Sequence, residues 1–148
     1  MKSNTSVEWY YQSASKKDMK DAREFLKIFG IRVIRFNKAT AWADRHGNVA
    51  LYNECSISEF WSCVFHEMCH VLAGRQRKYH KYHLDYHIDS IYKTIAVRKI
   101  GLRAELYVDK KAEGLMKIFL PDIPYIRSYR SIEERKWYRD WLDRNYPI

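Results

Sequence analysis

The chain is organised around the segment Phe65-His66-Glu67-Met68-Cys69-His70-Val71-Leu72. Because an α-helix has 3.6 residues per turn, His66 and His70, four residues apart, project from the same face of a helix. Two neutral imidazoles side by side provide half of the ligands of a zinc site. Glu67 follows the first histidine and is placed to act as a base on a water molecule beside the metal. The spacing therefore predicts a metal-binding helix that carries a catalytic glutamate.

The residues around this motif predict the helix that the spacing requires. Ser56 and Glu59, three residues apart, form a capping-box signature at its start, and Gly74 marks its end. The apolar residues that recur at helical spacing between them are Ile57, Phe60, Trp61, Val64, Phe65, Met68, Val71 and Leu72. The motif is therefore expected in the middle of a helix.

Length and composition limit the class of protein. A chain of 148 residues, of which 47% are apolar, is large enough for one domain with a core, so residues 1–148 are expected to form a single domain. The sequence has no apolar run of about 18 residues, and residues 1–6 are polar. We therefore expect a cytoplasmic protein with neither a signal peptide nor a membrane partner.

The 3 cysteines are an odd number and cannot all pair with one another. Cys63 and Cys69 are six residues apart in the predicted helix, a spacing at which side chains do not meet. We expect Cys55, Cys63 and Cys69 to be reduced and to act as small apolar side chains.

The net charge of +9 predicts attraction to acidic partners that weakens with salt. Part of the charge is concentrated in residues 75–83, which are expected to form a solvated loop. Nucleic acid is therefore a candidate partner besides a protein or peptide substrate. The sequence gives no signal for the oligomeric state.

Upstream of the motif, the sequence predicts a helix and a small sheet. Ser15 and Asp18 begin a helix that ends at Gly30. Residues 31–36 are rich in β-branched side chains and predict a strand, and residues 39–43 and 48–52 predict a hairpin that turns at Gly47. The expected fold is a compact α+β domain that, through the motif at His66 to His70, resembles a zincin. Its short, mostly antiparallel sheet of about three strands would pack on the active-site helix and on a helix that bears a glutamate.

Downstream of the motif, apolar periodicity predicts three more helices. The first covers residues 86–100 and is closed by Gly101, and the second covers residues 102–119 and is stopped by Pro121. The third begins at the capping signature of Ser131 and Glu134.

The identity of the third zinc ligand is open between two sets of residues, since a catalytic zinc takes three protein ligands and keeps one open position. In the first set, Glu105 binds the metal and Asp109, one turn later on the same helix, orients a histidine from outside the coordination sphere. Glu113 is a rival ligand on that helix. The second set consists of the histidines of the basic loop region, which are His80, His83 and His87.

At these positions the chain resembles a family of zinc peptidases. His66 to His70, followed by Glu105-Leu106-Tyr107-Val108-Asp109, is similar to the His-Glu-x-x-His and Glu-x-x-x-Asp motifs of gluzincin-type peptidases. Residues 110–116 resemble the Ala-x-x-Leu-Met continuation of ImmA/IrrE-like metallopeptidases. The resemblance covers roughly residues 56–120. It implies a Zn²⁺ ion bound by His66, His70 and Glu105, with Glu67 as the catalytic base and Asp109 in support.

The expected reaction is hydrolysis of a peptide bond in a protein substrate, and the resemblance implies that this substrate is a regulator. In such a reaction zinc activates a water molecule and Glu67 takes its proton. Two alternatives stay open. The three loop histidines are similar to the ligand set of SprT-like proteases, which act on DNA-bound proteins, and the charge alone is typical of a non-enzymatic basic binding module on a zincin scaffold.

Overall fold

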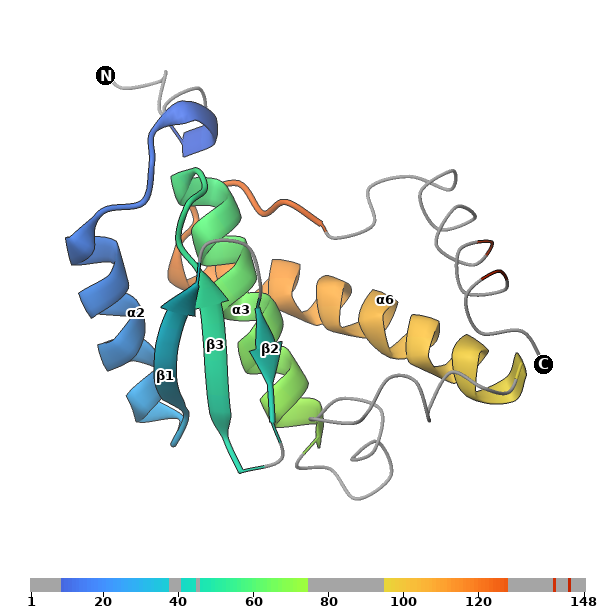
Figure 1. Cartoon of the computed structure of the whole chain (residues 1–148). Helices are drawn as coiled ribbons and strands as arrows, with labels where there is room; N and C mark the ends of the chain where they lie inside the picture. The colour runs from blue at the N-terminus through green and yellow to red at the C-terminus, as the bar shows by residue number, and fades with distance from the viewer. Residues whose placement is uncertain are drawn as a thin grey trace.

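The computed structural model describes residues 9–37, 41–44, 46–74, 95–127, 140 and 144, with the backbone alone at 74 and 95–106. The elements in chain order are α2 (Lys16–Ile28), β1 (Arg32–Asn37), β2 (Trp42–Ala43), β3 (Asn48–Tyr52), α3 (Ile57–Gly74) and α6 (Ile95–Phe119). The three strands form one sheet (Figure 1), so the chain has an α+β fold.

Helix α2 begins and ends where the sequence predicts. The Ser15 hydroxyl accepts a hydrogen bond from the backbone N–H of Asp18, and the Asp18 carboxylate accepts one from the backbone N–H of Ser15. At the other end Gly30 has a φ of 71°, a left-handed conformation that glycine adopts without steric cost. These two signals place the apolar face of α2, with Ala22 and Leu26, in the core.

The sheet is mixed, so the prediction of a mostly antiparallel sheet is wrong. The predicted hairpin is present, with Trp42 opposite Ala50 and with Gly47, at a φ of 80°, in the turn. However, β3 rather than β2 lies beside β1, and two reversals of direction along the chain make β1 and β3 parallel. The reason lies in the composition of β3. Its consecutive residues Val49, Ala50 and Leu51 are all buried, and a strand that is apolar on both faces is best placed at the centre.

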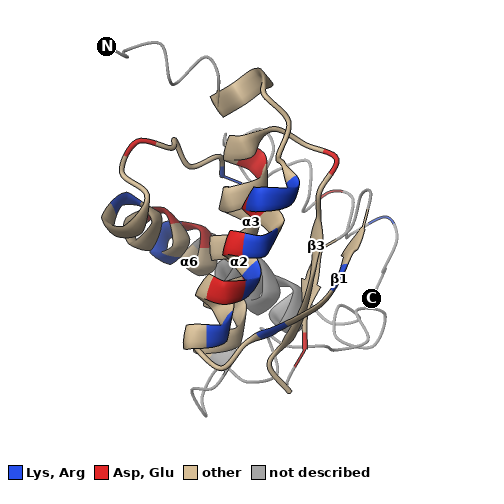
Figure 2. Cartoon of the chain, turned by 90° about the vertical axis from the view of Figure 1, so that its left-hand side faces the viewer, with Lys and Arg blue, Asp and Glu red and all other residues tan. Residues whose placement is uncertain are grey.

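Helix α3 forms the middle layer of the molecule. Seen edge-on, the sheet lies on one side of α3 and α6 on the other (Figure 2). Contacts between aromatic rings connect the helices. The ring centroids of Phe25 in α2 and Phe65 in α3 are 5.2 Å apart, and those of Phe65 and Phe119 in α6 are 6.2 Å apart. Ring pairs of this kind contribute about 0.5–1.5 kcal/mol each beyond their buried area. A helix buried on all sides can hold a polar site only if its neighbours supply partners.

Helix α6 is longer than predicted. The sequence predicted a break at Gly101, but one helix runs through it from Ile95 to Phe119. A glycine inside a helix costs about 1 kcal/mol relative to alanine, and good helix formers on both sides, such as Lys99 and Leu102, offset that cost. The continuous helix carries Asp109 past α3.

Several predictions fall on other parts of the chain. The basic cluster at 75–83 lies outside the described residues, and so does the predicted helix after Ser131, except for Asp140 and Arg144. No helix among the described residues is long and apolar enough to span a membrane.

Candidate metal centre

The helix that carries the motif is fixed at its start by the predicted capping box. The Ser56 hydroxyl accepts a hydrogen bond from the backbone N–H of Glu59 at 3.2 Å, and the Glu59 carboxylate accepts one from the backbone N–H of Ser56 at 3.3 Å. From there the helix is continuous to Gly74. His66 and His70 therefore lie on the same face of one continuous helix, as their spacing predicts.

The three motif residues that carry chemistry are all buried. His66 is 8% exposed, Glu67 7% and His70 6%. Burial of a polar side chain is unfavourable unless other groups form hydrogen bonds with it or it binds a metal. An ordinary core-facing helix surface is apolar, whereas this one carries three buried polar residues within five positions.

The two histidines point the same ring nitrogen at each other. His66 Nε2 and His70 Nε2 are 3.1 Å apart, and the ring planes are inclined at 71°. Two nitrogen ligands at about 2.0–2.1 Å from a tetrahedral zinc are separated by about 3.3 Å. The donor pair therefore fits a zinc ion with only a small movement of the rings. The same separation also suits an N–H···N hydrogen bond, which satisfies the pair without a metal.

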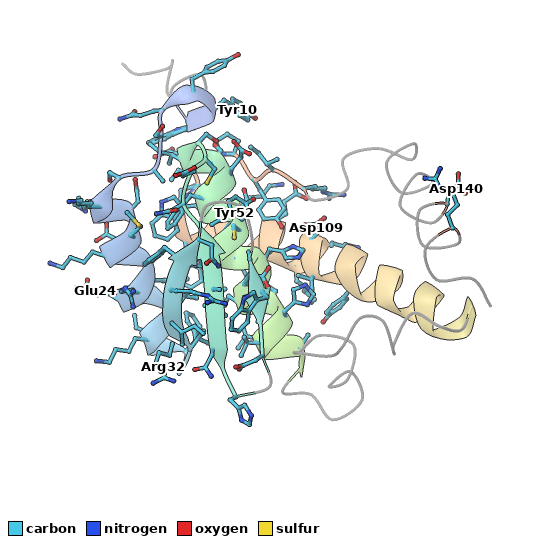
Figure 3. The ribbon with its side chains drawn as sticks, viewed as in Figure 1. Tyr10, Glu24, Arg32, Tyr52, Asp109 and Asp140 are labelled. Atoms are coloured by element: carbon cyan, nitrogen blue, oxygen red, sulfur yellow. The ribbon has the colours of Figure 1, made fainter. Side chains whose placement is uncertain are left out.

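Asp109 of α6 decides where the proton of His66 lies. Its Oδ1 atom is 3.1 Å from His66 Nδ1, and the carboxylate is 2% exposed. Because a carboxylate accepts hydrogen bonds, the proton belongs on Nδ1, and Nε2 then keeps the lone pair that a metal needs. Figure 3 shows Asp109 where α6 passes α3. The structure thus brings Asp109 to the histidine pair, although Asp109 follows His66 by 43 residues in sequence.

Tyr125 contacts the same carboxylate, and sequence reasoning missed it. Its hydroxyl donates a hydrogen bond of 2.7 Å to Asp109 Oδ1. Burial raises the pKa of Tyr125, and the charge of Asp109 and this hydrogen bond raise it further, so the phenol stays protonated. The only signal in the sequence is the pair Pro121 and Pro124, which ends α6 and indicates a change of direction without showing where Tyr125 lies.

Glu67 is buried in α3, one residue after His66, and its charge acts on two groups near it. Burial raises the pKa of Tyr52, at the end of β3, and of Cys63, one turn before Glu67, and the charge of Glu67 contributes to both increases. Figure 3 shows Tyr52 beside α3. The carboxylate of Glu67 is therefore within electrostatic range of the end of β3.

The predicted third ligands cannot be placed. Glu105 belongs to α6, one turn before Asp109, but its side chain lies outside the described residues, and so do His80, His83 and His87. Within the part of the chain whose side chains are described, no group of three His, Cys, Asp or Glu residues is arranged to hold a metal ion. Zinc coordination by a third residue stays a prediction.

Glu113, the rival ligand, is held by a different partner. Its Oε1 atom accepts hydrogen bonds from both Nε and Nη2 of Arg127, the former at 3.1 Å. The same contact, with the charge of Glu113, raises the pKa of the guanidinium. An ion pair with arginine occupies the carboxylate, so Glu113 is a poorer candidate ligand than Glu105.

The cysteines behave as predicted with respect to pairing. Cys55, Cys63 and Cys69 are free thiols, and the two on α3 are buried. Burial raises the pKa of Cys69 to about 12, although it is adjacent to His70 in sequence and Lys111 acts in the opposite direction. A thiol that resists ionisation is a poor metal ligand.

Comparisons with protein-family models, with curated proteins and with solved structures found no match to this chain. The resemblance to gluzincin-type peptidases therefore rests on the motif residues alone.

Proposed function

We infer that the chain is a zinc-dependent peptidase of the zincin type that hydrolyses peptide bonds in a protein substrate. The observation that carries this proposal is the convergence of His66 Nε2 and His70 Nε2 at 3.1 Å on a buried helix face, with Asp109 at the back of His66. A buried pair of imidazoles oriented by a carboxylate is the usual form of a histidine-zinc site.

Each residue of the site has a distinct task. His66 and His70 would hold zinc through Nε2, and Glu105 is the proposed third ligand. Zinc, when bound, polarises a carbonyl group and lowers the pKa of water to about 7. To bind zinc through Nε2, His70 would carry its proton on Nδ1.

Glu67 would move the protons of the reaction. It follows His66 directly in α3 and is buried like the two histidines. As a general base it takes a proton from the attacking water, and as a general acid it returns that proton to the leaving amine. Its buried position excludes bulk water from the proton-transfer path.

The proposed substrate is an extended segment of a protein. Strand β2 lies at an edge of the sheet and packs on α3, the helix that bears the motif. A strand at the edge of a sheet can pair with a peptide by main-chain hydrogen bonds. The ImmA/IrrE-like resemblance favours a transcriptional regulator as the protein that is cut.

The two alternatives make different demands on the molecule. A SprT-like protease requires one of His80, His83 and His87 as the third ligand. A basic binding module requires a surface of one charge, whereas Figure 2 shows acidic and basic residues interspersed along the ribbons of α2 and α6. Neither alternative has a supporting contact among the described residues.

The test is peptidase activity of the zinc-loaded protein on a denatured protein substrate, with Glu67→Gln as the variant. We expect the substitution to keep the fold and the bound zinc and to lower kcat/KM by about 10²–10⁴-fold, the usual contribution of a general base. Glu54→Gln, which changes an exposed glutamate, is the matched control and should retain full activity. Activity in the Glu67→Gln protein equal to that of wild type would contradict the proposal.

A further inference from the structure

The segment after α6, residues 120–127, forms a strap between the two helices of the metal centre. Three consecutive residues fasten it. Tyr125 donates to Asp109 of α6, the backbone N–H of Ile126 donates to Ser62 Oγ of α3 at 2.8 Å, and Arg127 pairs with Glu113 of α6. The strap therefore contacts α3 and α6 alternately, next to the place where Asp109 meets His66.

We propose that Tyr125 is a positioning residue of the metal centre, which acts on His66 through Asp109. A role in zinc binding rests on the proposed function, but the contacts of Tyr125 with Asp109 and of Asp109 with His66 do not depend on zinc. Asp109 Oδ1 accepts two hydrogen bonds, one of 2.7 Å from the Tyr125 hydroxyl and one of 3.1 Å from His66 Nδ1. The shorter bond fixes the oxygen atom to which the histidine must donate.

Two physical effects follow from this shared oxygen. First, the bond from Tyr125 limits rotation of the carboxylate, so the His66 ring is held with Nε2 toward His70. Second, a donor on Oδ1 lowers the proton affinity of the carboxylate, so the shared proton stays on His66 Nδ1 and Asp109 stays ionised. Tyr125 does not touch the site of the metal and is not a catalytic residue.

The strap lies where it can keep α3 and α6 at a fixed distance from each other. Asp109 reaches His66 only while the two helices keep their spacing, and the hydrogen bonds at Ser62 and Glu113 hold the strap to one helix each. Leu120, Ile123 and Tyr125 also pack against the core, so the phenol is brought to Asp109 by a segment that is itself anchored. Ordered support of this kind is what keeps a ligand within the narrow tolerance of a metal site.

The experiment compares Tyr125→Phe with Ser62→Ala. The first removes one hydroxyl and keeps the ring, whereas the second loosens the strap and leaves the contact with Asp109 in place. The first readout is the histidine imidazole ¹⁵N spectrum of the metal-free protein, which reports the tautomer and proton exchange at His66. The second is zinc affinity, measured by competition with a chelating dye.

We expect Tyr125→Phe to accelerate exchange of the His66 Nδ1 proton and to weaken zinc binding by about threefold to tenfold, the range for loss of one supporting hydrogen bond. Ser62→Ala is expected to lower thermal stability, to leave the His66 signals unchanged and to change zinc affinity by less than about twofold. If Tyr125→Phe does not fold, 3-fluorotyrosine at position 125 changes only the strength of the donor, and a shift of the His66 Nδ1 proton is then required.

The outcomes separate this proposal from the proposed function. Unchanged His66 signals and unchanged zinc affinity in Tyr125→Phe would overturn the role of Tyr125 even if wild type binds zinc. The second outcome is that Tyr125→Phe alters the His66 signals but the wild-type protein binds no zinc. This outcome would support the role of Tyr125 while the peptidase proposal fails. Equal effects of Tyr125→Phe and Ser62→Ala on His66 would mean that the strap acts through packing alone, which also overturns the proposal.

Discussion

Two sides of α3 are buried for different reasons. Toward the sheet, Phe60 stacks on Phe36 of β1, with 6.2 Å between the ring centroids, and this apolar contact needs no polar partner. Toward α6, His66 is buried only because Asp109 and His70 satisfy its two ring nitrogens. The first kind of burial favours folding and the second opposes it unless the polar partners are in place. Stability is therefore expected from the sheet side and chemistry from the α6 side, and substitutions on the two sides should have different effects.

The largest effect on stability is expected on the sheet side. Phe60 is fully buried, and Phe60→Ala removes a ring and leaves a cavity. We expect the free energy of unfolding, measured by urea denaturation, to fall by about 3–5 kcal/mol. Tyr11→Ala, at a residue that is 83% exposed, is the control and should change it by less than about 0.5 kcal/mol. A loss below about 1 kcal/mol in Phe60→Ala would mean that this side of α3 does not support the fold.

On the α6 side, the expected effect is on metal binding. Asp109→Asn replaces the carboxylate that accepts from His66 with a neutral amide, so zinc affinity should weaken by about 10–100-fold, as measured by chelator competition. Glu113→Gln, one turn further along α6 and paired with Arg127, is the matched control and should leave zinc affinity unchanged. Equal losses in the two variants would show that α6 acts through general electrostatics and not through the contact with His66.

A third effect concerns the buried thiols and the pH dependence of stability. Burial raises the pKa of the Cys63 thiol, and the charge of Glu67 adds to the increase. Above pH 9 the unfolded chain releases the Cys63 proton while the folded chain retains it, so the unfolded state is favoured as the pH rises. Cys55, whose pKa burial raises to about 12, acts in the same direction.

We therefore expect the free energy of unfolding to fall between pH 9 and pH 12 by up to about 1.4 kcal/mol per pH unit for each such thiol. Urea denaturation at a series of pH values measures this slope. In Cys63→Ala the slope should be shallower by the contribution of one thiol. An identical slope in wild type and Cys63→Ala would contradict the burial argument.

The smallest effect compares the two helix caps. Ser15 and Ser56 both begin capping boxes, but Ser15 is exposed and Ser56 is 7% exposed. Removal of either hydroxyl leaves a backbone N–H without its acceptor, at a cost of about 0.5–2 kcal/mol. We expect Ser56→Ala to lower the thermal midpoint more than Ser15→Ala, because water cannot readily replace the lost bond at a buried cap. The reverse order would show that the start of α3 is set by its packing and not by its cap.

Local signals in the sequence predicted the local structure well. Capping residues and glycines placed both ends of α2, the start of α3 and the turn at Gly47, because these signals act within a few residues. The sequence failed at Gly101 and at the pairing of β1. Whether one glycine ends a helix, and which of two strands takes the central position, are decided by packing between distant segments.

The candidate site shows the same division. His66, Glu67 and His70 follow from spacing on one helix, and the structure places the predicted carboxylate Asp109 against His66. Tyr125 could not have been found, since its contact depends on the path of the chain after α6 and on no periodic pattern. Glu105 stays a prediction from the motif, because its side chain lies outside the described residues.

The most direct test of the central claim is the zinc content of the purified protein, measured by elemental analysis for wild type, His70→Ala, Glu105→Ala and His83→Ala. We expect about one equivalent of zinc in wild type and in His83→Ala, and loss of that zinc in the other two variants. Loss in His83→Ala with retention in Glu105→Ala would instead support the SprT-like ligand set. Absence of zinc from a folded wild-type protein supplied with the metal would contradict the claim that His66 and His70 form a metal centre.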